Sequence, residues 1–259
     1  MEEVIRFEGV DKAFGSNVIY EGLDLSIHKG EVLTILGGSG TGKSVMLKMM
    51  LGIIPWDAGR VTVLGTDITG RSDREILPVR RRLGMVFQQA ALFDSLTVFE
   101  NLAYPLLERG MTDEAELKSR VAKALARVDL PGTEDMMPAD LSGGMRKRVG
   151  IARAVIQSPE ILLYDEPTTG LDPINVRRVD ELILALRKEL GLTSVVVTHD
   201  LQSAFLLSDR LAMLARRKIV AVASGAELMR SEVPEVRDFI DAMNVTASEL
   251  RRAGEQAHV

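Results

Sequence analysis

The sequence predicts an α/β fold, because short runs of β-branched and aliphatic residues alternate with segments of helical periodicity. The expected strands lie at residues 32–36, 60–64, 83–87, 161–164, 194–198, 211–214 and 219–223. The expected helices lie at residues 43–51, 113–128, 144–157, 175–190 and 201–208. An alternation of this kind is typical of a parallel sheet that is covered by helices.

Two parts of the chain depart from this alternation. The first 30 residues and residues 60–68 have the pattern of short strands joined by turns, and they predict a small antiparallel layer beside the parallel sheet. Between Gln88 and Pro159 the strand pattern stops, and only helices and turns are expected. This region predicts a helical subdomain at about residues 89–158.

The C-terminal segment, residues 233–259, stands apart from the domain expected at residues 1–232. It contains one amphipathic helix followed by a charged tail. The apolar residues at helical spacing are Val233, Val236, Ile240 and Met243. The sequence does not define the role of this helix, which could brace a dimer or bind a small regulatory subunit.

The composition is that of a folded globular protein. The 259 residues are 46% hydrophobic, and the net charge of -5 provides no positive field that would attract nucleic acid or an anionic membrane. We therefore expect no nucleic-acid partner. The absence of cysteine excludes disulfides and thiolate metal sites, and the three scattered histidines argue against a zinc site.

The sequence predicts neither a signal peptide at its beginning nor a membrane-spanning segment. The beginning, MEEVIRFEGV, is acidic and lacks the apolar core of a signal peptide. The most apolar stretch, VMLKMMLGII, is interrupted by Lys48 and is shorter than the roughly 18–20 residues needed to cross a bilayer. Any membrane contact is expected to involve a partner or a surface.

A glycine-rich loop lies between the strand at residues 32–36 and the helix that follows. It has the spacing of a phosphate-binding loop, with the strand and helix that such a loop requires. Its residues are Gly37, Gly38, Ser39, Gly40, Thr41, Gly42, Lys43 and Ser44. Backbone N–H groups and the helix N-terminus would bind phosphate oxygens, Lys43 would supply a positive charge, and Ser44 would place a hydroxyl on Mg²⁺.

The loop alone leaves several interpretations open. It could be an ordinary glycine turn before a helix, with Lys43 solvated. As a phosphate loop it would suit a kinase, a GTPase, a motor ATPase or a transporter ATPase equally well. A second motif, ILLYDEP, narrows the choice: Asp165 at the end of a buried strand can hold Mg²⁺, and Glu166 is placed to polarise an attacking water.

A third motif, LSGGMRKRVGIARA, predicts a second helix N-terminus able to bind an anion. Ser142 is suited to cap the helix, and Gly143 and Gly144 expose backbone N–H groups. Standing alone, this motif would indicate only a serine-capped helix. One nucleotide does not need two such cradles from a single subunit.

Six motifs together, in this order, resemble the nucleotide-binding subunit of ATP-binding-cassette (ABC) transporters over residues 4 to about 230. They are Gly37 to Ser44, Gln88, LSGGM, YDEP, TGLDP and His199. The resemblance implies a P-loop, RecA-like core with a helical signature subdomain, and it implies ATP hydrolysis. In that family two subunits pack head to tail, and each ATP lies between the phosphate loop of one subunit and the signature serine and glycines of the other.

The resemblance also implies roles for single residues. Phe14 would stack on adenine, Gln88 would reach Mg²⁺ or the attacking water, Asp172 would contact the opposite subunit, and His199 would hydrogen-bond the γ-phosphate. Otherwise Phe14 could be a core or turn aromatic, a role that suits nearby Tyr20 better. Asp172 could be a helix cap, and His199 a packed side chain.

The expected site is therefore composite. The expected catalytic residues are Lys43, Gln88, Glu166 and His199. The expected metal ligands are Ser44, Gln88 and Asp165. The remaining nucleotide contacts are expected from the phosphate loop, Phe14, Ser142, Gly143, Gly144 and Asp172. Met145 departs from the family pattern, which most often has Gln there, so the contact of that Gln near the nucleotide is not expected here.

The segment after Gln88 concerns the membrane partner. Ala90, Ala91, Leu92 and Phe93 form an apolar patch where the family receives the membrane subunit, although core packing of the helical region would also explain it. The stretches ALFDSLTVFENLAYPL, LSGGM, LDPI and VRDFIDAM are similar to the subgroup that serves MCE-type lipid transporters, including the Mla phospholipid system and related steroid or solvent-tolerance systems. This implies a permease and an MCE-domain lipid-binding protein as partners, at the cytoplasmic face of the inner membrane.

Two alternatives remain. The chain could be a transporter ATPase for amino acids, sugars or metals, because the cargo is recognised by other subunits. It could also be a soluble ABC protein of ribosomes or DNA, although such proteins usually carry two cassettes or a long coiled coil. The basic triplets at residues 80–82 and 146–148 are expected to be solvated. The sequence determines neither the cargo nor the direction of transport.

Overall fold

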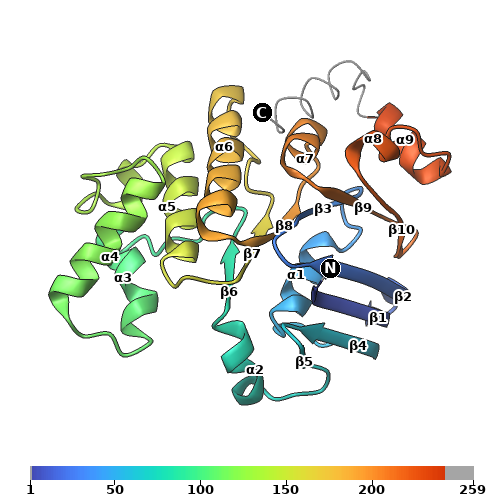
Figure 1. Ribbon diagram of the computed structural model, residues 1–259, viewed down its shortest axis with the longest axis horizontal. Helices are drawn as coiled ribbons and strands as arrows, with labels where there is room; N and C mark the ends of the chain where they lie inside the picture. The colour runs from blue at the N-terminus through green and yellow to red at the C-terminus, as the bar shows by residue number, and fades with distance from the viewer. Residues whose placement is uncertain (1, 243–259) are drawn as a thin grey trace. The chain divides into compact units, whose positions relative to one another are not determined.

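The computed structural model describes residues 2–242 (Figure 1), and these residues divide into two units. Among the described residues, the first unit comprises residues 2–80 and 192–242, and the second comprises residues 81–191. Met243, which was expected on the C-terminal helix, lies outside the described residues.

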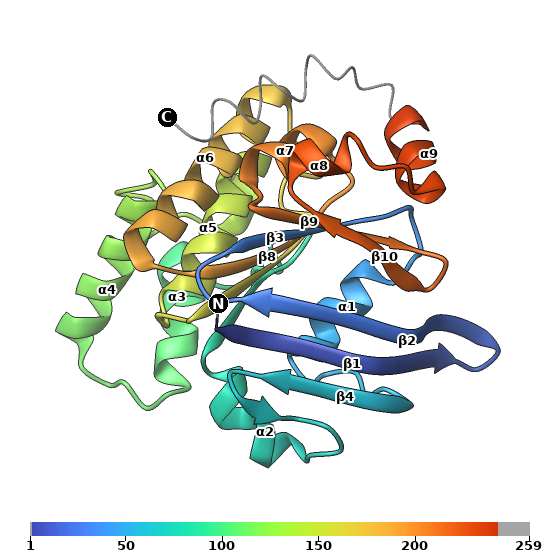
Figure 2. The same cartoon turned by 45° about the vertical axis from the view of Figure 1, so that its right-hand side comes forward.

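An antiparallel sheet begins the first unit (Figure 2). β1 (Glu3–Phe14) and β2 (Asn17–His28) are each 12 residues long and form a hairpin. β4 (Ala58–Val63) pairs with β1, and β5 (Thr66–Asp67) pairs with β4, so the strand order is β2-β1-β4-β5. The predicted antiparallel layer is confirmed, but its first two strands are long rather than short.

The parallel strands of the first unit carry the elements around the phosphate loop. β3 (Val32–Leu36) pairs in parallel with β8 (Thr193–Val197) and with β9 (Arg210–Ala215), and β10 (Lys218–Ala223) pairs antiparallel with β9. Every residue of β3 and β8 is buried, as expected for parallel strands inside a sheet. The helices of this unit are α1 (Lys43–Met50), α2 (Asp73–Arg80), α7 (Leu201–Leu207), α8 (Gly225–Leu228) and α9 (Pro234–Ala242).

The C-terminal helix α9 packs on the hydrophobic core of the first unit, to which it belongs. Val236 is buried in a cluster with Phe205, Met213 and Leu228, and Val233 and Ile240 pack against the same cluster. Three of the four residues predicted to form the apolar face of this helix therefore contact the core.

The second unit is mainly helical. Its two strands, β6 (Leu83–Val86) and β7 (Ile161–Asp165), pair in parallel. Its helices are α3 (Val98–Leu107), α4 (Glu114–Arg127), α5 (Gly143–Val155) and α6 (Pro173–Leu190), with a short 3-10 helix at Pro138–Asp140. Helices α3, α4 and α5 contact one another (Figures 1 and 2).

Side-chain caps fix where the helices of the second unit begin. Thr97 and Glu100 form a capping box at α3, and the carboxylate of Asp113 accepts hydrogen bonds from two N–H groups of α4. Gly191 ends α6 in the left-handed conformation. Asp113 is therefore the cap of α4 and not its first helical residue, which is why the start predicted at residue 113 differs from the observed one by one residue.

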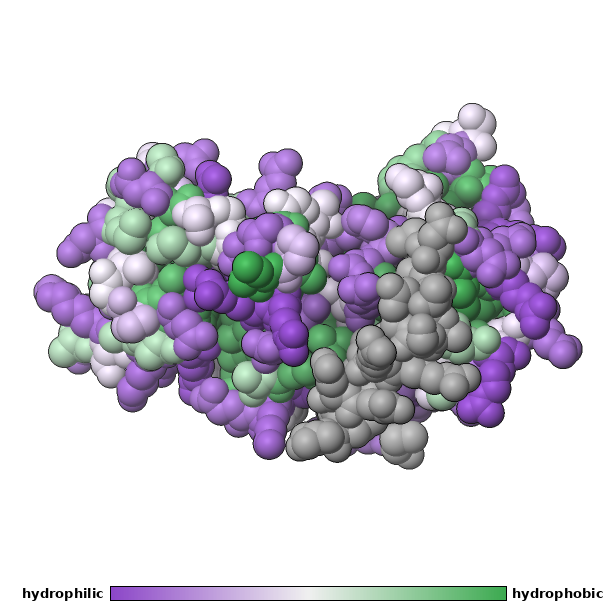
Figure 3. Space-filling view, turned by 90° about the horizontal axis from the view of Figure 1, so that it is seen from above, coloured by the Kyte–Doolittle hydropathy of each residue, from purple (hydrophilic) through white to green (hydrophobic). Residues whose placement is uncertain are grey.

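No helix among residues 2–242 is both long and apolar enough to span a bilayer. Figure 3 shows one face of the protein, on which hydrophilic side chains predominate and hydrophobic ones form small separate groups.

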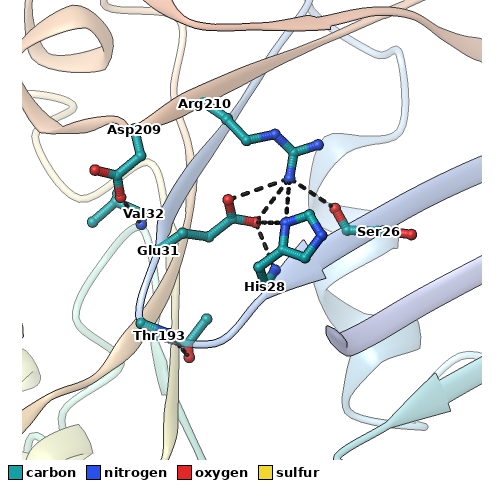
Figure 4. A network of polar contacts seen from close by, with 8 residues as sticks. Ser26, His28, Glu31, Val32, Thr193, Asp209 and Arg210 are labelled. Atoms are coloured by element: carbon teal, nitrogen blue, oxygen red, sulfur yellow. Dashed lines mark hydrogen bonds and ion pairs between the residues drawn. The ribbon is translucent and has the colours of Figure 1, made fainter. Parts of the chain in front are cut away.

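A partly buried polar network joins the ends of three strands of the first unit (Figure 4). The Glu31 carboxylate accepts hydrogen bonds from Arg210 Nη1 at 3.1 and 3.2 Å and from the His28 N–H at 2.7 Å. The same Arg210 nitrogen lies 2.8 Å from His28 Nδ1. Since β2 ends at His28, β3 begins at Val32 and β9 begins at Arg210, this network sets where β3 starts relative to its neighbours.

Replacing Glu31 with Ala is expected to destabilise the first unit. The change removes the acceptor for Arg210 and for the His28 N–H, and the cost is about 2–3 kcal/mol because Arg210 keeps part of its hydration. Thermal unfolding followed by circular dichroism measures the shift. Glu21→Ala is the matched control, because Glu21 forms an exposed ion pair with Arg217 that contributes at most about 1 kcal/mol. Equal shifts for the two variants would contradict this role of the network.

Candidate functional site

The phosphate loop lies between β3 and α1 and needs glycine at two of its positions. Gly37 has φ 156° and Gly42 has φ 104°, values that other residues rarely adopt. A Cβ atom at Gly37 would lie 2.5 Å from the carbonyl oxygen of Leu214, and one at Gly42 would lie 2.5 Å from Cγ2 of Ile19. The spacing of these glycines is therefore imposed by the backbone and its close neighbours.

Protein donors bind the carbonyl oxygens of this loop. Lys43 Nζ donates to the carbonyls of Gly37 at 2.8 Å and Gly38 at 3.0 Å, and Tyr20 Oη donates to the carbonyl of Gly42 at 2.6 Å. Burial raises the pKa of Tyr20, so its hydroxyl remains a donor. The first turn of α1 contains no acidic residue. The loop thus lies at the positive N-terminal end of α1, and its carbonyl oxygens are hydrogen-bonded to Lys43 and Tyr20. This arrangement suits the binding of an anion.

His199 emerges at the same sheet edge as the phosphate loop. In the parallel pairing of β3 with β8, Ile35 is opposite Val197. Gly37 and His199 each follow these paired residues by two positions. Because parallel strands end at a common edge, the register places His199, which is exposed, on the side of the loop.

Phe14 ends β1 and is 47% exposed, so it is not a core aromatic. The Lys12 ammonium lies 4.7 Å from the centre of its ring. Lys12 is paired with Tyr20, whose hydroxyl holds the phosphate loop. Tyr20 is fully buried and is the core aromatic of this region, as its sequence context predicted.

The two adjacent acids at the end of β7 have different environments. Asp165 is the last residue of the strand and is buried. Glu166 has left-handed backbone, with φ 50°, and its Oε2 accepts a hydrogen bond of 2.9 Å from Thr169 Oγ1. A left-handed glutamate is strained by an amount on the order of 1–3 kcal/mol, and such strain is concentrated at functional sites.

Gln88 is joined to Glu166 by a lysine that the sequence did not single out. Lys147 of α5 is 6% exposed, and its Nζ donates to the carbonyl oxygens of Gln88 and, at 3.2 Å, of Glu166. Burial lowers the pKa of Lys147, while the carboxylates of Glu166 and Asp165 raise it. The prediction that this basic triplet is solvated is therefore wrong for Lys147.

Two other members of the basic triplets also differ from the prediction. Arg148 donates to the carbonyls of Val128 at 2.9 Å and Asp129 at 3.2 Å. Arg80 donates to the carbonyl of Leu51 at 2.9 Å. These guanidinium groups satisfy backbone carbonyls instead of pointing into solvent.

The signature segment lies at the N-terminal ends of α5 and α6. Ser142 caps α5, and its Oγ accepts from the Met145 N–H at 3.2 Å. A Cβ atom at Gly144 would lie 2.7 Å from Oδ1 of Asn175, so a larger residue there would displace the Asn175 side chain. Asn175 in turn donates to the carboxylate of Asp172, which caps α6. The second unit thus places Ser142, Gly143 and Asp172 together, with all three exposed.

Asp172 is a helix cap in this structure. Its Oδ1 accepts from the N–H groups of Ile174 at 3.0 Å and Asn175 at 3.1 Å. Hydrogen bonds from Asn175 and Ile174 lower the pKa of Asp172. The capping interpretation of this residue is confirmed, and a contact with an opposite subunit stays a prediction.

The apolar patch after Gln88 is smaller than predicted, because Ala90 is only 2% exposed. A Cβ atom at Gly150 would lie 3.1 Å from the Ala90 Cβ, so Ala90 packs on α5. Phe93 is 45% exposed, its ring centre is 5.1 Å from that of Tyr104, and Tyr104 and Leu107 are also exposed. We call Phe93, Tyr104 and Leu107 the aromatic patch.

Within each unit the structure therefore brings part of the expected site together. The first unit holds the phosphate loop, His199 and Phe14, and the second holds Gln88, Asp165 and Glu166 in one group and Ser142 to Gly144 with Asp172 in another. The described residues contain no group of three or more acidic or histidine side chains that could hold a metal by themselves. The hydroxyl of Ser44 in the first unit and the carboxylate of Asp165 in the second are each groups of a kind that binds Mg²⁺, which typically takes one or two carboxylates together with substrate phosphates.

Comparison with known proteins identifies the family. The model of the ABC transporter family matches residues 20–169. The chain belongs to the ABC transporter family. Its fold is that of the ABC cassettes. One solved relative is the dimeric cassette MJ0796 in a post-hydrolysis state, bound to ADP and Pi. That structure superposes on this chain with a TM-score of 0.78 at 32% sequence identity, covering 85% of this chain and 98% of its own. This chain is accordingly an ATP-binding ATPase.

Among curated relatives of this ABC ATPase, three differ in their described cargo. The probable ribonucleotide transport ATP-binding protein mkl of Mycobacterium tuberculosis is 39% identical over 93% of this chain and 67% of its own length. MlaF of Haemophilus influenzae, an intermembrane phospholipid transport system ATP-binding protein, is 37% identical over 87% of this chain and 86% of its own. The methionine import ATP-binding protein MetN of Rhizobium johnstonii is 40% identical over 85% of this chain and 60% of its own length.

Proposed function

We propose that this chain is the ATPase subunit of an MCE-type phospholipid transporter, docked on a permease at the cytoplasmic face of the inner membrane. The observation that carries the proposal is the similarity to MlaF, which extends over most of both chains. The stretches that indicated this subgroup from the sequence, including ALFDSLTVFENLAYPL, agree with it. An MCE-domain lipid-binding protein and a small regulatory subunit are the further partners we infer.

We infer that the working unit is a head-to-tail homodimer with two ATP and two Mg²⁺. The phosphate loop and Lys43 of one copy would bind the triphosphate from one side, and Ser142, Gly143 and Gly144 of the other copy would bind it from the opposite side. The exposure of Ser142 and Gly143 at a capped helix N-terminus supports this arrangement. The dimeric form of the MJ0796 cassette supports it as well.

The residues of this chain would divide the hydrolytic reaction among them. Mg²⁺ held by Ser44, Asp165 and Gln88 would neutralise phosphate charge. Glu166 would accept a proton from the attacking water, His199 would donate a hydrogen bond to the γ-phosphate, and Lys43 would exchange its loop carbonyls for phosphate oxygens. Phe14 would stack on the adenine with the ring face that Lys12 does not cover.

Co-purification tests the cargo. The tagged protein is isolated with mild detergent from its own membranes, and bound proteins and lipids are identified by mass spectrometry. Recovery of a permease, an MCE-domain protein and phospholipid supports the proposal. Recovery of a methionine-binding protein, or of bound ribonucleotide cargo, would replace it with the function that MetN or mkl suggests.

The aromatic patch is the surface that we expect to bind the permease. Phe93→Asp places a charge in an apolar contact, and loss of such an anchor weakens binding by at least about tenfold. Leu77→Asp is the control, because Leu77 is 40% exposed on α2 and is not part of the patch. Recovery of the permease in pull-downs and binding of a fluorescent ATP analogue are measured in parallel. Unchanged recovery with Phe93→Asp would show that the patch is misplaced.

A further inference from the structure

Lys147 joins the ends of two neighbouring parallel strands. In the pairing of β6 with β7, Val86 is opposite Tyr164. Gln88 and Glu166 each follow these paired residues by two positions, and Lys147 Nζ donates to the carbonyl oxygen of both. One buried ammonium group therefore connects the two segments in the second unit that carry proposed reaction residues.

Both of these segments contain left-handed backbone at residues other than glycine. Glu166 has φ 50°, and Ala90 and Ala91, just after Gln88, have φ 60° and 49°. Such conformations persist only where the surroundings enforce them. Lys147 binds the carbonyl of Glu166 itself, and Arg153, also on α5, donates to the carbonyls of Ala90 at 2.9 Å and Ala91 at 2.8 Å.

The Glu166 carboxylate depends on this backbone for its direction. Its side chain leaves a left-handed residue, and Thr169 Oγ1 then holds Oε2 at 2.9 Å. If the carbonyl of Glu166 lost its ammonium partner, the backbone could relax toward an ordinary conformation, and the carboxylate would turn away from its present position. A displacement of about 1 Å at a reacting group can lower a rate on the order of 100-fold.

We propose that Lys147 is a positioning residue for ATP hydrolysis: its ammonium group fixes the backbones of Gln88 and Glu166 relative to each other and ties both to α5. The inference rests on the roles proposed above for Gln88 and Glu166. Because Ser142 caps the same helix, Lys147 also links the signature end of α5 to the acid that activates water. A lysine suits this task, since its three N–H donors can satisfy two carbonyls at once.

The test compares Lys147→Met with Arg148→Met in the purified protein. Methionine keeps an unbranched apolar stem like that of lysine but lacks the terminal ammonium group, so it donates no hydrogen bond. Arg148 is the matched control, because this neighbour on α5 also binds two carbonyls, those of Val128 and Asp129, which carry no proposed reaction residue. We expect Lys147→Met to lower kcat about 10- to 100-fold with KM and nucleotide Kd changed less than about threefold. Arg148→Met should leave kcat within about threefold.

Two further variants separate positioning from folding. Lys147→Arg restores hydrogen-bond donors, so its kcat should be at least several-fold higher than that of Lys147→Met. Lys147→Gln is a polar variant for use if the methionine form is insoluble, and its kcat should still be about tenfold lower than that of the wild type. In a Glu166→Gln background, Lys147→Met should lower kcat little further, because both changes act on one group.

The outcomes distinguish this inference from the proposed function. Equal losses of kcat in Lys147→Met and Arg148→Met, or a loss seen in KM alone, would overturn the positioning role. If Glu166→Gln abolishes turnover and Lys147→Met leaves it unchanged, only the inference about Lys147 is contradicted. Near-normal turnover in Glu166→Gln would instead remove the proposed role of Glu166 itself.

Discussion

Replacing Glu166 with Gln is expected to lower the turnover number of the ATPase by about 10²- to 10⁴-fold, the usual contribution of a positioned general base. The amide has almost the shape of the carboxylate but cannot accept the proton of the attacking water. Nucleotide affinity should be kept, because Glu166 does not belong to the loop that binds the phosphates. Phosphate release gives kcat, and equilibrium binding of a fluorescent ATP analogue gives Kd.

Glu160→Gln is the matched control for this prediction. Glu160 lies in the same unit, forms an exposed ion pair with Arg82 and has no proposed part in the reaction. Its kcat should stay within about twofold of the wild type, since exposed ion pairs contribute little. If Glu166→Gln hydrolysed ATP as fast as the Glu160→Gln control, the proton acceptor would have to be sought elsewhere.

The sequence was sufficient for the elements that have strong local signals. β3, β7 and β8 are buried along their whole length, so uninterrupted apolar runs revealed them. α4 was found from its helical periodicity, which places Leu117, Val121 and Leu125 on one buried stripe. The phosphate loop followed from spacing, because φ values at Gly37 and Gly42 and the close approach of Leu214 and Ile19 permit no other residue.

Two helices were missed for a common reason. α2 contains Pro78 and α3 contains Pro105, and a proline inside a helix removes a backbone hydrogen bond and argues against helix in a local reading of the sequence. In α3 the capping box of Thr97 and Glu100 was a signal that could have outweighed the proline. The length of β1 and β2 was underestimated because bulges interrupt their alternation.

The role of Lys147 could not be derived from the sequence. A lysine between two arginines has the pattern of a solvated face, and only tertiary structure places it beneath the carbonyls of Gln88 and Glu166. Ala90 illustrates the same limit: an apolar run of four residues looked exposed, yet its first member packs on Gly150. Long-range contacts decided both cases, and no local periodicity encodes them.

Mixing two inactive variants is expected to restore ATPase activity, which is the most direct test of a site shared between copies. Lys43→Ala removes the cation of the phosphate loop, and Ser142→Arg fills the exposed helix tip with a bulky side chain. Each change alone should lower kcat by at least about 100-fold, as expected for loss of a group that stabilises transition-state charge. In a mixed dimer the Ser142→Arg copy supplies an intact loop and the Lys43→Ala copy supplies an intact signature.

When equal amounts of the two variants pair at random, about half of the dimers are mixed. Each mixed dimer has one intact site of two, so the ATPase activity should rise to about a quarter of the wild-type value. A chain that carries both substitutions is the control, because no pairing of it with itself contains an intact site. Thermal unfolding shows whether Ser142→Arg keeps its fold after losing a helix cap that contributes about 1 kcal/mol. If differently tagged copies form mixed dimers and no activity returns, then each protomer binds its nucleotide alone, and the exposed tip of α5 has another purpose.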